Sequence, residues 1–211
     1  FGSPNKKDSY QAHGSPLGDA EIALARKELG WESAPFEIPA DILSAWRAAG
    51  ARGADVRKSW EQRLAASAHK AEFTRLFKGE LPASFAATMA DYKKALAKNP
   101  PHIATRNSSQ NTLDIINPAV PETIGGSADL TGSNNTKSKD LKVLNAENYG
   151  GRYMHWGIRE HGMAAAMNGM ALHGGVIPYG GAFFCFTDYC RPSMRLASLM
   201  GIRSIFVMTH D

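Results

Sequence analysis

The second half of the sequence predicts an α/β fold, a parallel sheet with flanking helices, and the first half predicts a helical connector that precedes it. After about residue 100, short apolar runs typical of strands alternate with amphipathic helical segments. Charged residues become sparser over the same stretch and glycines more frequent. We therefore predict two regions, residues 1–100 and residues 101–211.

The first region is expected to be helical and well solvated, because its many charges alternate with apolar positions at helical spacing. Glycine and proline mark the ends of its helices. Four helical segments are expected: residues 19–29, 39–46, 57–77 and a last one that ends near residue 98.

The second region alternates between the two kinds of element. The expected helices are residues 109–116, 159–173 and 186–200. The expected strands are residues 122–127, 153–156, 176–179 and 204–208, with a polar loop over residues 129–148. Parallel βαβ units gather their functional groups at the carboxyl ends of the strands. The side chains at those ends, which we expect to cluster, are Asp129, Glu160, Phe183 and His210.

The helix over residues 159–173 is central to the prediction. An apolar stripe at i, i+4 and i+7 predicts its buried face, formed by Met163, Met167 and Met170. Small residues on a neighbouring face would let another helix or a second subunit approach closely; these are Gly162, Ala166 and Gly169. Glu160 stands at the start of this helix, where a carboxylate commonly only complements the positive helix end. The local pattern alone favours that structural interpretation.

The composition excludes several classes of protein. A chain of 211 residues with 43% hydrophobic residues can bury a substantial core, and it is not a disordered protein. Its net charge of +4 comes from basic residues interleaved with acidic ones, so nucleic-acid binding is not expected. Without a membrane span or a secretory signal, and with only Cys185 and Cys190, a soluble cytoplasmic protein is predicted. The chain lacks an initial methionine, and we expect an internal piece of a longer polypeptide.

Seven short motifs, in register over the whole chain, resemble the transketolase family. They are Gly2-Ser3-Pro4-Asn5, His13-Gly14-Ser15-Pro16-Leu17-Gly18, Ala25-Arg26-Lys27-Glu28-Leu29-Gly30-Trp31, Ala104-Thr105-Arg106, Gly126-Ser127-Ala128-Asp129-Leu130 with Ser133-Asn134, Gly157-Ile158-Arg159-Glu160 and Thr209-His210-Asp211. The resemblance implies the end of a diphosphate-binding domain, a connector and most of a pyrimidine-binding domain, truncated at its carboxyl end. One departure is Ala182, where many members have a threonine before the first aromatic residue of the cofactor pocket.

The resemblance implies thiamine diphosphate as cofactor, together with Mg²⁺ or Ca²⁺. The family's Gly-Asp-Gly metal and diphosphate motif is expected upstream of Phe1, so no metal ligand is expected within this chain. The residues implied to bind the cofactor are His13, Asp129, Glu160, Phe183, Phe186 and Tyr189. Without the resemblance, the aromatic residues would be assigned to core packing and Asp129 to turn chemistry.

Glu160 matches the family's glutamate that reaches the cofactor from the partner subunit. There it bonds the aminopyrimidine ring and favours the imino tautomer, whose exocyclic nitrogen takes the proton from the cofactor's C2 carbon. Partial burial beside an apolar stripe raises the proton affinity of a carboxylate, which suits this role.

The resemblance also implies a grip on the terminal phosphate of the substrate, formed by Arg106, Ser133 and His210. Arginine offers a planar fork of donors, and serine and histidine add further donors to phosphate oxygens. His13 is implied to lie near the cofactor and the substrate oxygens, where it would act as a proton shuttle. It is the second implied catalytic residue, in addition to Glu160. The remaining histidines are expected to be structural: His69, His102, His155, His161 and His173.

The expected function is that of a transketolase, the reversible transfer of a two-carbon ketol group from a ketose phosphate to an aldose phosphate in the pentose phosphate pathway. The family's active site lies at the subunit interface of a homodimer. A dihydroxyacetone synthase, whose acceptor is formaldehyde, shares these motifs. A catalytically silent subunit that only binds a partner is a further alternative, against which the retained Glu160 argues.

Overall fold

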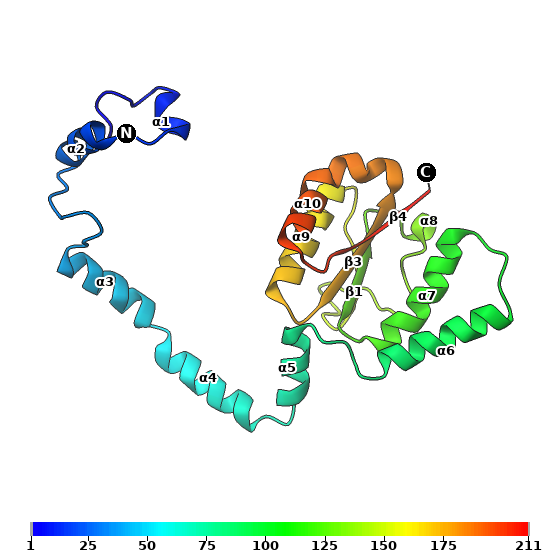
Figure 1. Cartoon of the computed structure of the whole chain (residues 1–211). Coiled ribbons are helices and arrows are strands. Elements are labelled where there is room, and N and C mark those ends of the chain that lie inside the picture. Colours follow the sequence, from blue (N-terminus) through cyan, green and yellow to red (C-terminus); the bar gives the residue numbers. More distant parts are fainter. Residues whose placement is uncertain (1, 211) are drawn as a thin grey trace. The chain divides into compact units, whose positions relative to one another are not determined.

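A computed structural model describes residues 2–210 of the chain, which divide into two units, residues 2–65 and residues 66–210. The helices of the first unit are α1 (Gln11–Gly14), α2 (Asp19–Glu28), α3 (Ala40–Ala51) and α4 (Ala54–Ala66), which ends at the boundary (Figure 1). The second unit contains α5 (Lys70–Lys78), α6 (Phe85–Lys98), α7 (Thr105–Ala119), α8 (Thr131–Asn134), α9 (Glu160–His173), the short 3-10 helix η1 (Phe184–Phe186) and α10 (Thr187–Met200). Its strands are β1 (Thr123–Ser127), β2 (Tyr153–His155), β3 (Ile177–Phe183) and β4 (Ile205–Thr209).

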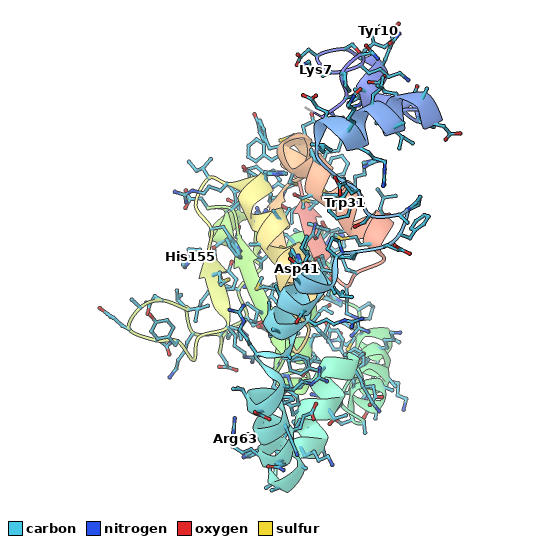
Figure 2. All side chains as sticks on the ribbon, turned by 90° about the vertical axis from the view of Figure 1, so that its left-hand side faces the viewer. Lys7, Tyr10, Trp31, Asp41, Arg63 and His155 are labelled. Atoms are coloured by element: carbon cyan, nitrogen blue, oxygen red, sulfur yellow. The ribbon has the colours of Figure 1, made fainter. Side chains whose placement is uncertain are left out.

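The beginning of the first unit is held by a buried carboxylate. Glu21 of α2 accepts hydrogen bonds from the Ser3 hydroxyl at 2.5 Å, from the Asn5 backbone N–H at 2.9 Å and from the Asn5 side-chain amide at 3.0 Å. The bonds from Ser3 and then Asn5 hold the pKa of Glu21 below its ordinary value. Elsewhere in this unit large side chains are exposed, including Tyr10, which Figure 2 labels, and Phe36.

The second unit is built on a parallel sheet whose strand order is β2-β1-β3-β4. Gly125 of β1 lies opposite Tyr153 of β2, and Phe183 at the end of β3 lies opposite Thr209 of β4. Because the strands are parallel, the loops that follow all of them leave the same edge of the sheet. Figure 2 labels His155, the last residue of the edge strand β2. The predicted fold class, an α/β unit with a parallel sheet and flanking helices, is confirmed.

Helices cover both faces of this sheet (Figure 1). On one face, Met163 and Met167 of α9 are completely buried against Ala182 of β3, which confirms the predicted apolar stripe. A Cβ atom on Gly180 of β3 would lie only 2.6 Å from the sulfur of Met167, so glycine is required there for α9 to approach. The opposite face carries a second cluster, in which Tyr153 and Tyr179 pack with Leu141 and with Leu113 of α7.

Several predicted boundaries are wrong. The helix predicted over residues 39–46 continues to Ala51, and the predicted loop over residues 129–148 contains the short helix α8. The predicted helix over residues 57–77 is interrupted at residues 67–69, so that α4 and α5 are separate. The helix predicted from residue 109 begins at Thr105 and continues past Pro118, because Arg152 bonds the carbonyl groups at its carboxyl end. The strand predicted to end at Tyr179 continues to Phe183, because β4 pairs with the whole second half of β3. Gly180 and Gly181 have low strand propensity, so the sequence does not predict this extension.

The amino end of the sheet is fixed by paired charges and hydrogen bonds. Arg75 of α5 lies 2.7 Å from Glu122, the residue before β1, and 2.7 Å from Glu72. The hydrogen bonds to Glu72 and Glu122 raise the pKa of Arg75 above its ordinary value. Arg152 donates at 3.1 Å to the carbonyl oxygen of Asn117, which the last turn of α7 leaves without an intrahelical partner, and at 2.9 Å to that of Pro121, just beyond the helix.

Candidate active site at the carboxyl ends of the strands

Glu160 is the first residue of α9, and its position there follows from the turn between β2 and the helix. Its side chain is almost completely buried, with 7% of the residue exposed. None of the residues 2–210 bonds its carboxylate, and none of their side-chain polar atoms is both sealed from solvent and unpaired, so the Glu160 oxygens open into the adjoining cavity. Water in the cavity can solvate this carboxylate, and its lone pairs are not used by donors among the described residues. The side chain is therefore available to a hydrogen-bond donor from outside this chain.

A cavity of about 690 Å³ lies beside this carboxylate. Its lining residues come from the start of α9, from η1 and from α10: Ile158, Arg159, Glu160, His161, Gly162, Phe186 and Tyr189. The lining is mostly apolar, and Glu160 is its carboxylate. This combination of an aromatic wall and one buried charge is typical of a small-molecule site that fixes the orientation of a polar ring.

The three aromatic residues predicted for the cofactor form a continuous row. The ring centroids of Phe183 and Phe186 are 5.7 Å apart, and those of Phe186 and Tyr189 are 5.8 Å apart, both tilted. Phe186 packs partly into the core, whereas Tyr189 is 65% exposed. The predicted alternative, pure core packing, is therefore excluded for Tyr189.

Cys190 lies one residue beyond Tyr189 and is fully buried. Burial raises the pKa of its thiol, and the negative charge of Glu160 raises it further. A thiol in this environment remains protonated at neutral pH and is a poor nucleophile. Cys190 is consequently part of the packing under the cavity and not a candidate catalytic group.

The three residues predicted to hold a phosphate are brought together by the fold. The Arg106 Nη1 atom, at the start of α7, lies 3.0 Å from the His210 Nε2 atom and 3.4 Å from the backbone oxygen of Ser133 in α8. The ring of His210 also meets that of Phe183 edge-on, with centroids 5.4 Å apart. Since Phe183 begins the aromatic row, the predicted phosphate grip and the aromatic row adjoin each other.

Asp129 and His13 complete the predicted set. Asp129 follows β1 by two residues, its residue surface is exposed, and its φ of 60° is a left-handed conformation that is costly for a residue other than glycine. Strain of this kind is common at functional sites, but nothing in the described residues bonds the Asp129 side chain. His13 belongs to the first unit, at the end of α1, and is exposed. Asp211 of the closing motif lies outside the described residues.

The sequence reasoning missed several residues of the cavity. Ile158 and Arg159 lie within the motif that identified Glu160, but no role was assigned to them. His161 was expected to be structural, yet it lines the cavity while its Nδ1 atom contacts the Ser193 hydroxyl at 3.2 Å. Their adjacency to Glu160 was the available signal.

Within residues 2–210, no three or more histidine, cysteine, aspartate or glutamate side chains are grouped so as to bind a metal ion. Across the same residues, no helix combines the length and apolar character that crossing a membrane requires.

Comparison with known proteins identifies relatives over the whole chain. The family described as "Transketolase, pyrimidine binding domain" matches residues 101–211, and that described as "Transketolase, thiamine diphosphate binding domain" matches residues 1–82. A transketolase of Rhodobacter capsulatus is 58% identical over 213 residues, and transketolase 1 of Escherichia coli is 47% identical over 216. Both alignments cover 100% of this chain and 32% of the relative, so the chain spans about a third of the relatives' length.

Solved structures give the same result. The transketolase from Leishmania mexicana superposes with a TM-score of 0.79 at 34% identity, over 100% of this chain and 32% of that one. The transketolase from Campylobacter jejuni superposes with a TM-score of 0.75 at 30% identity, over 100% and 31%.

Proposed function

The chain belongs to the transketolase family, and from that premise we propose that it supplies part of the active site of an enzyme that transfers a two-carbon ketol unit between sugar phosphates. The donor would be a ketose phosphate such as xylulose 5-phosphate, and the acceptor an aldose phosphate such as ribose 5-phosphate. The observation that carries the proposal is the buried carboxylate of Glu160, which has no partner among the described residues and borders a cavity with an aromatic wall.

Thiamine diphosphate, when bound, supplies a carbon that becomes nucleophilic once it loses its C2 proton. Glu160 would hold a proton at the ring nitrogen of the aminopyrimidine and so favour the tautomer that accepts the C2 proton. A carboxylate suits this because it can share a proton with a ring nitrogen in a site sheltered from water. Phe183, Phe186 and Tyr189 would stack on the pyrimidine and fix its orientation. The space and the residue types beside Glu160 fit that ring.

The other predicted residues take roles that suit their chemistry. Arg106, Ser133 and His210 would hold the substrate's terminal phosphate through charge-assisted hydrogen bonds. Asp129 would lie close to the cofactor, and His13 would move a proton to or from the substrate oxygens. A divalent ion, Mg²⁺ or Ca²⁺, is part of the proposal, although the described residues offer no group of ligands for it. The boundary between regions 1–100 and 101–211 and the cytoplasmic location also stay predictions.

We further propose that two copies assemble so that Glu160 of one faces the cofactor held by the other. The surface around the cavity supports this, because Ile158 is 80% exposed and Tyr189 is 65% exposed, an unusual state for large apolar side chains. Gly162 on the outer side of α9 leaves room for close approach.

The proposed function is tested in a full-length chimera, in which this chain replaces the matching 213 residues of the R. capsulatus transketolase. We expect the chimera to be a dimer by sedimentation and to transfer the ketol unit from xylulose 5-phosphate to ribose 5-phosphate. A chimera that folds and binds thiamine diphosphate but transfers nothing would support the silent-subunit alternative. A strong preference for formaldehyde as acceptor would instead indicate a dihydroxyacetone synthase.

The phosphate grip is tested by Arg106→Ala in the same chimera. Loss of a charge-assisted hydrogen bond should cost about 1.5–3 kcal/mol, which is roughly ten- to a hundredfold in kcat/KM for phosphorylated acceptors. An unphosphorylated acceptor such as glycolaldehyde should be nearly unaffected. If both acceptors lose equally, Arg106 has a structural role and the assignment of the grip is wrong.

A further inference from the structure

Asn134 lies between two residues of the proposed phosphate grip and has no role in the function described so far. It ends α8 directly after Ser133, and it is completely buried. A buried side-chain amide has to find partners for both its oxygen and its nitrogen, or it destabilises the fold. The positions of its hydrogen-bond partners therefore show which parts of the fold Asn134 connects.

The amide of Asn134 joins α8 to two strands at their carboxyl ends. Its Nδ2 atom donates to the Thr209 hydroxyl of β4 at 2.5 Å. Its Oδ1 atom accepts from the Ser127 hydroxyl of β1 at 3.1 Å. The Ser127 oxygen in turn accepts from the backbone N–H of Leu130 at 3.1 Å, which fixes the start of α8.

The two residues next to these contacts both belong to the grip. Ser133 precedes Asn134 in the chain, and His210 follows Thr209. Arg106 touches both, at 3.4 Å from the Ser133 backbone oxygen and 3.0 Å from the His210 ring. We propose that Asn134 is a positioning residue that sets the distance between Ser133 and His210 through its hydrogen bond to Thr209, and so shapes the phosphate grip without touching the substrate. This inference rests on the proposed function.

A purely structural role makes a different prediction. If Asn134 only fills space, the shape of Thr209 matters and its hydroxyl does not, because a buried site is stabilised by packing volume. If it positions the grip, the hydroxyl of Thr209 is essential for phosphate recognition. Thr209→Val keeps the shape and removes the acceptor, together with a long contact of 3.5 Å from the hydroxyl to the His210 backbone oxygen, whereas Thr209→Ser keeps both.

The matched control is Thr131→Val. Thr131 belongs to the same helix α8, but its hydroxyl contacts the Tyr153 hydroxyl at 3.0 Å and not a strand end that carries a residue of the grip. The same chemical change at this position therefore perturbs α8 without touching the Asn134–Thr209 bond. Asn134 itself is left unchanged, because substituting it would also break its bond with Ser127.

The experiment uses the chimera with thiamine diphosphate bound. It measures kcat and KM with ribose 5-phosphate and with glycolaldehyde as acceptors. One neutral hydrogen bond contributes about 0.5–1.5 kcal/mol, so Thr209→Val should raise KM for ribose 5-phosphate roughly two- to tenfold. The kcat and both glycolaldehyde parameters should stay within about twofold, and Thr209→Ser and Thr131→Val should resemble the parent. If Thr209→Val does not fold, Thr209→Ala is compared with Thr209→Ser, because these two variants differ only in the hydroxyl.

The outcomes separate this inference from the proposed function. Three results would overturn the positioning role: equal losses with both acceptors, no change in KM in Thr209→Val, or the same rise in KM in Thr131→Val. Each counts against this inference alone if Arg106→Ala still weakens phosphorylated acceptors more than unphosphorylated ones. If Arg106→Ala shows no phosphate selectivity, or the parent chimera does not transfer the ketol unit, the proposed function itself is wrong.

Discussion

The two ends of the sheet use charged residues in opposite ways. At the amino end Glu122 is buried and fully paired, with Arg75 at 2.7 Å. At the carboxyl end Glu160 is buried to a similar degree but has no partner within residues 2–210. A glutamate side chain thus stabilises the fold at the amino end of the sheet, and another is left available to a ligand at the carboxyl end.

From this difference we infer that the carboxyl end of the sheet, where Glu160 lies, is the end that serves catalysis. The Glu122 carboxylate is bonded within the fold by Arg75, whereas the Glu160 carboxylate faces a cavity and bonds none of the described residues. The two ends should respond differently to one chemical change, the replacement of a carboxylate by an amide of the same shape.

The largest effect is expected for Glu160→Gln in the chimera. The amide keeps the size of the side chain but cannot share a proton with the pyrimidine nitrogen. Contributions of this kind are on the order of a hundred- to ten-thousandfold, so hydrogen–deuterium exchange at the cofactor's C2 should slow by that factor. The thermal midpoint should stay nearly the same, because no bond between the Glu160 side chain and another described residue is lost. Exchange at the parent rate would mean that Glu160 only complements the end of α9.

Glu122→Gln should show the reverse pattern. Removing the charge leaves Arg75 with the Glu72 carboxylate and the Glu80 backbone oxygen, and breaking a buried ion pair costs about 3 kcal/mol at the lower end of the usual range. Backbone amides of β1 should then exchange with solvent roughly a hundredfold faster, as followed by mass spectrometry. C2 exchange on the cofactor should be unchanged at temperatures where the protein remains folded. A variant that slows C2 exchange without loosening β1 would contradict the division between the two ends.

The order of elements and the identity of the core could be predicted because hydrophobic periodicity reports them directly. The stripe at Met163 and Met167 is an example. The second half of β3 was missed, since Gly180 and Gly181 carry no strand propensity and are there because other groups pack closely against them. The residues of the site were identified by resemblance, as Arg106 and His210 are ordinary in sequence and meet only through long-range contacts. The missing partner of Glu160 and the bridging amide of Asn134 depend on three-dimensional neighbours that no local pattern encodes.

A smaller effect should appear at high pH through Tyr179, whose hydroxyl donates to the Thr136 carbonyl at 2.9 Å on the face covered by α7. Burial raises its pKa to about 12, from about 10 in an unfolded chain. The folded state therefore favours the neutral phenol, and this contribution is complete below pH 10 and is lost as the pH rises from 10 to 12. Its size is about 2–3 kcal/mol.

The measurement is the thermal midpoint of the chimera and of its Tyr179→Phe variant across that pH range. The variant should be less stable at pH 8, where the hydroxyl still forms its hydrogen bonds, but its stability should fall less steeply between pH 10 and 12. Parallel curves for the two proteins would show that Tyr179 does not ionise on unfolding there. The neighbouring Tyr153, whose pKa burial also raises, remains in both proteins, and because its charge raises the pKa of Tyr179 the difference between the two curves includes this coupling.

The smallest effect is expected for Glu80→Gln, which makes the same substitution close to Arg75 but in an exposed pair. The Glu80 carboxylate lies 3.9 Å from Lys78, and the two side chains are 60% and 63% exposed. Water already solvates both charges, so the pair contributes less than about 0.5 kcal/mol. Amide exchange of β1 should therefore change by less than about twofold, against the hundredfold expected for Glu122→Gln. If the two variants loosen β1 equally, the loss of a negative charge near Arg75 is responsible and not the burial of the pair, and the contrast between the ends of the sheet would have to be explained by net charge.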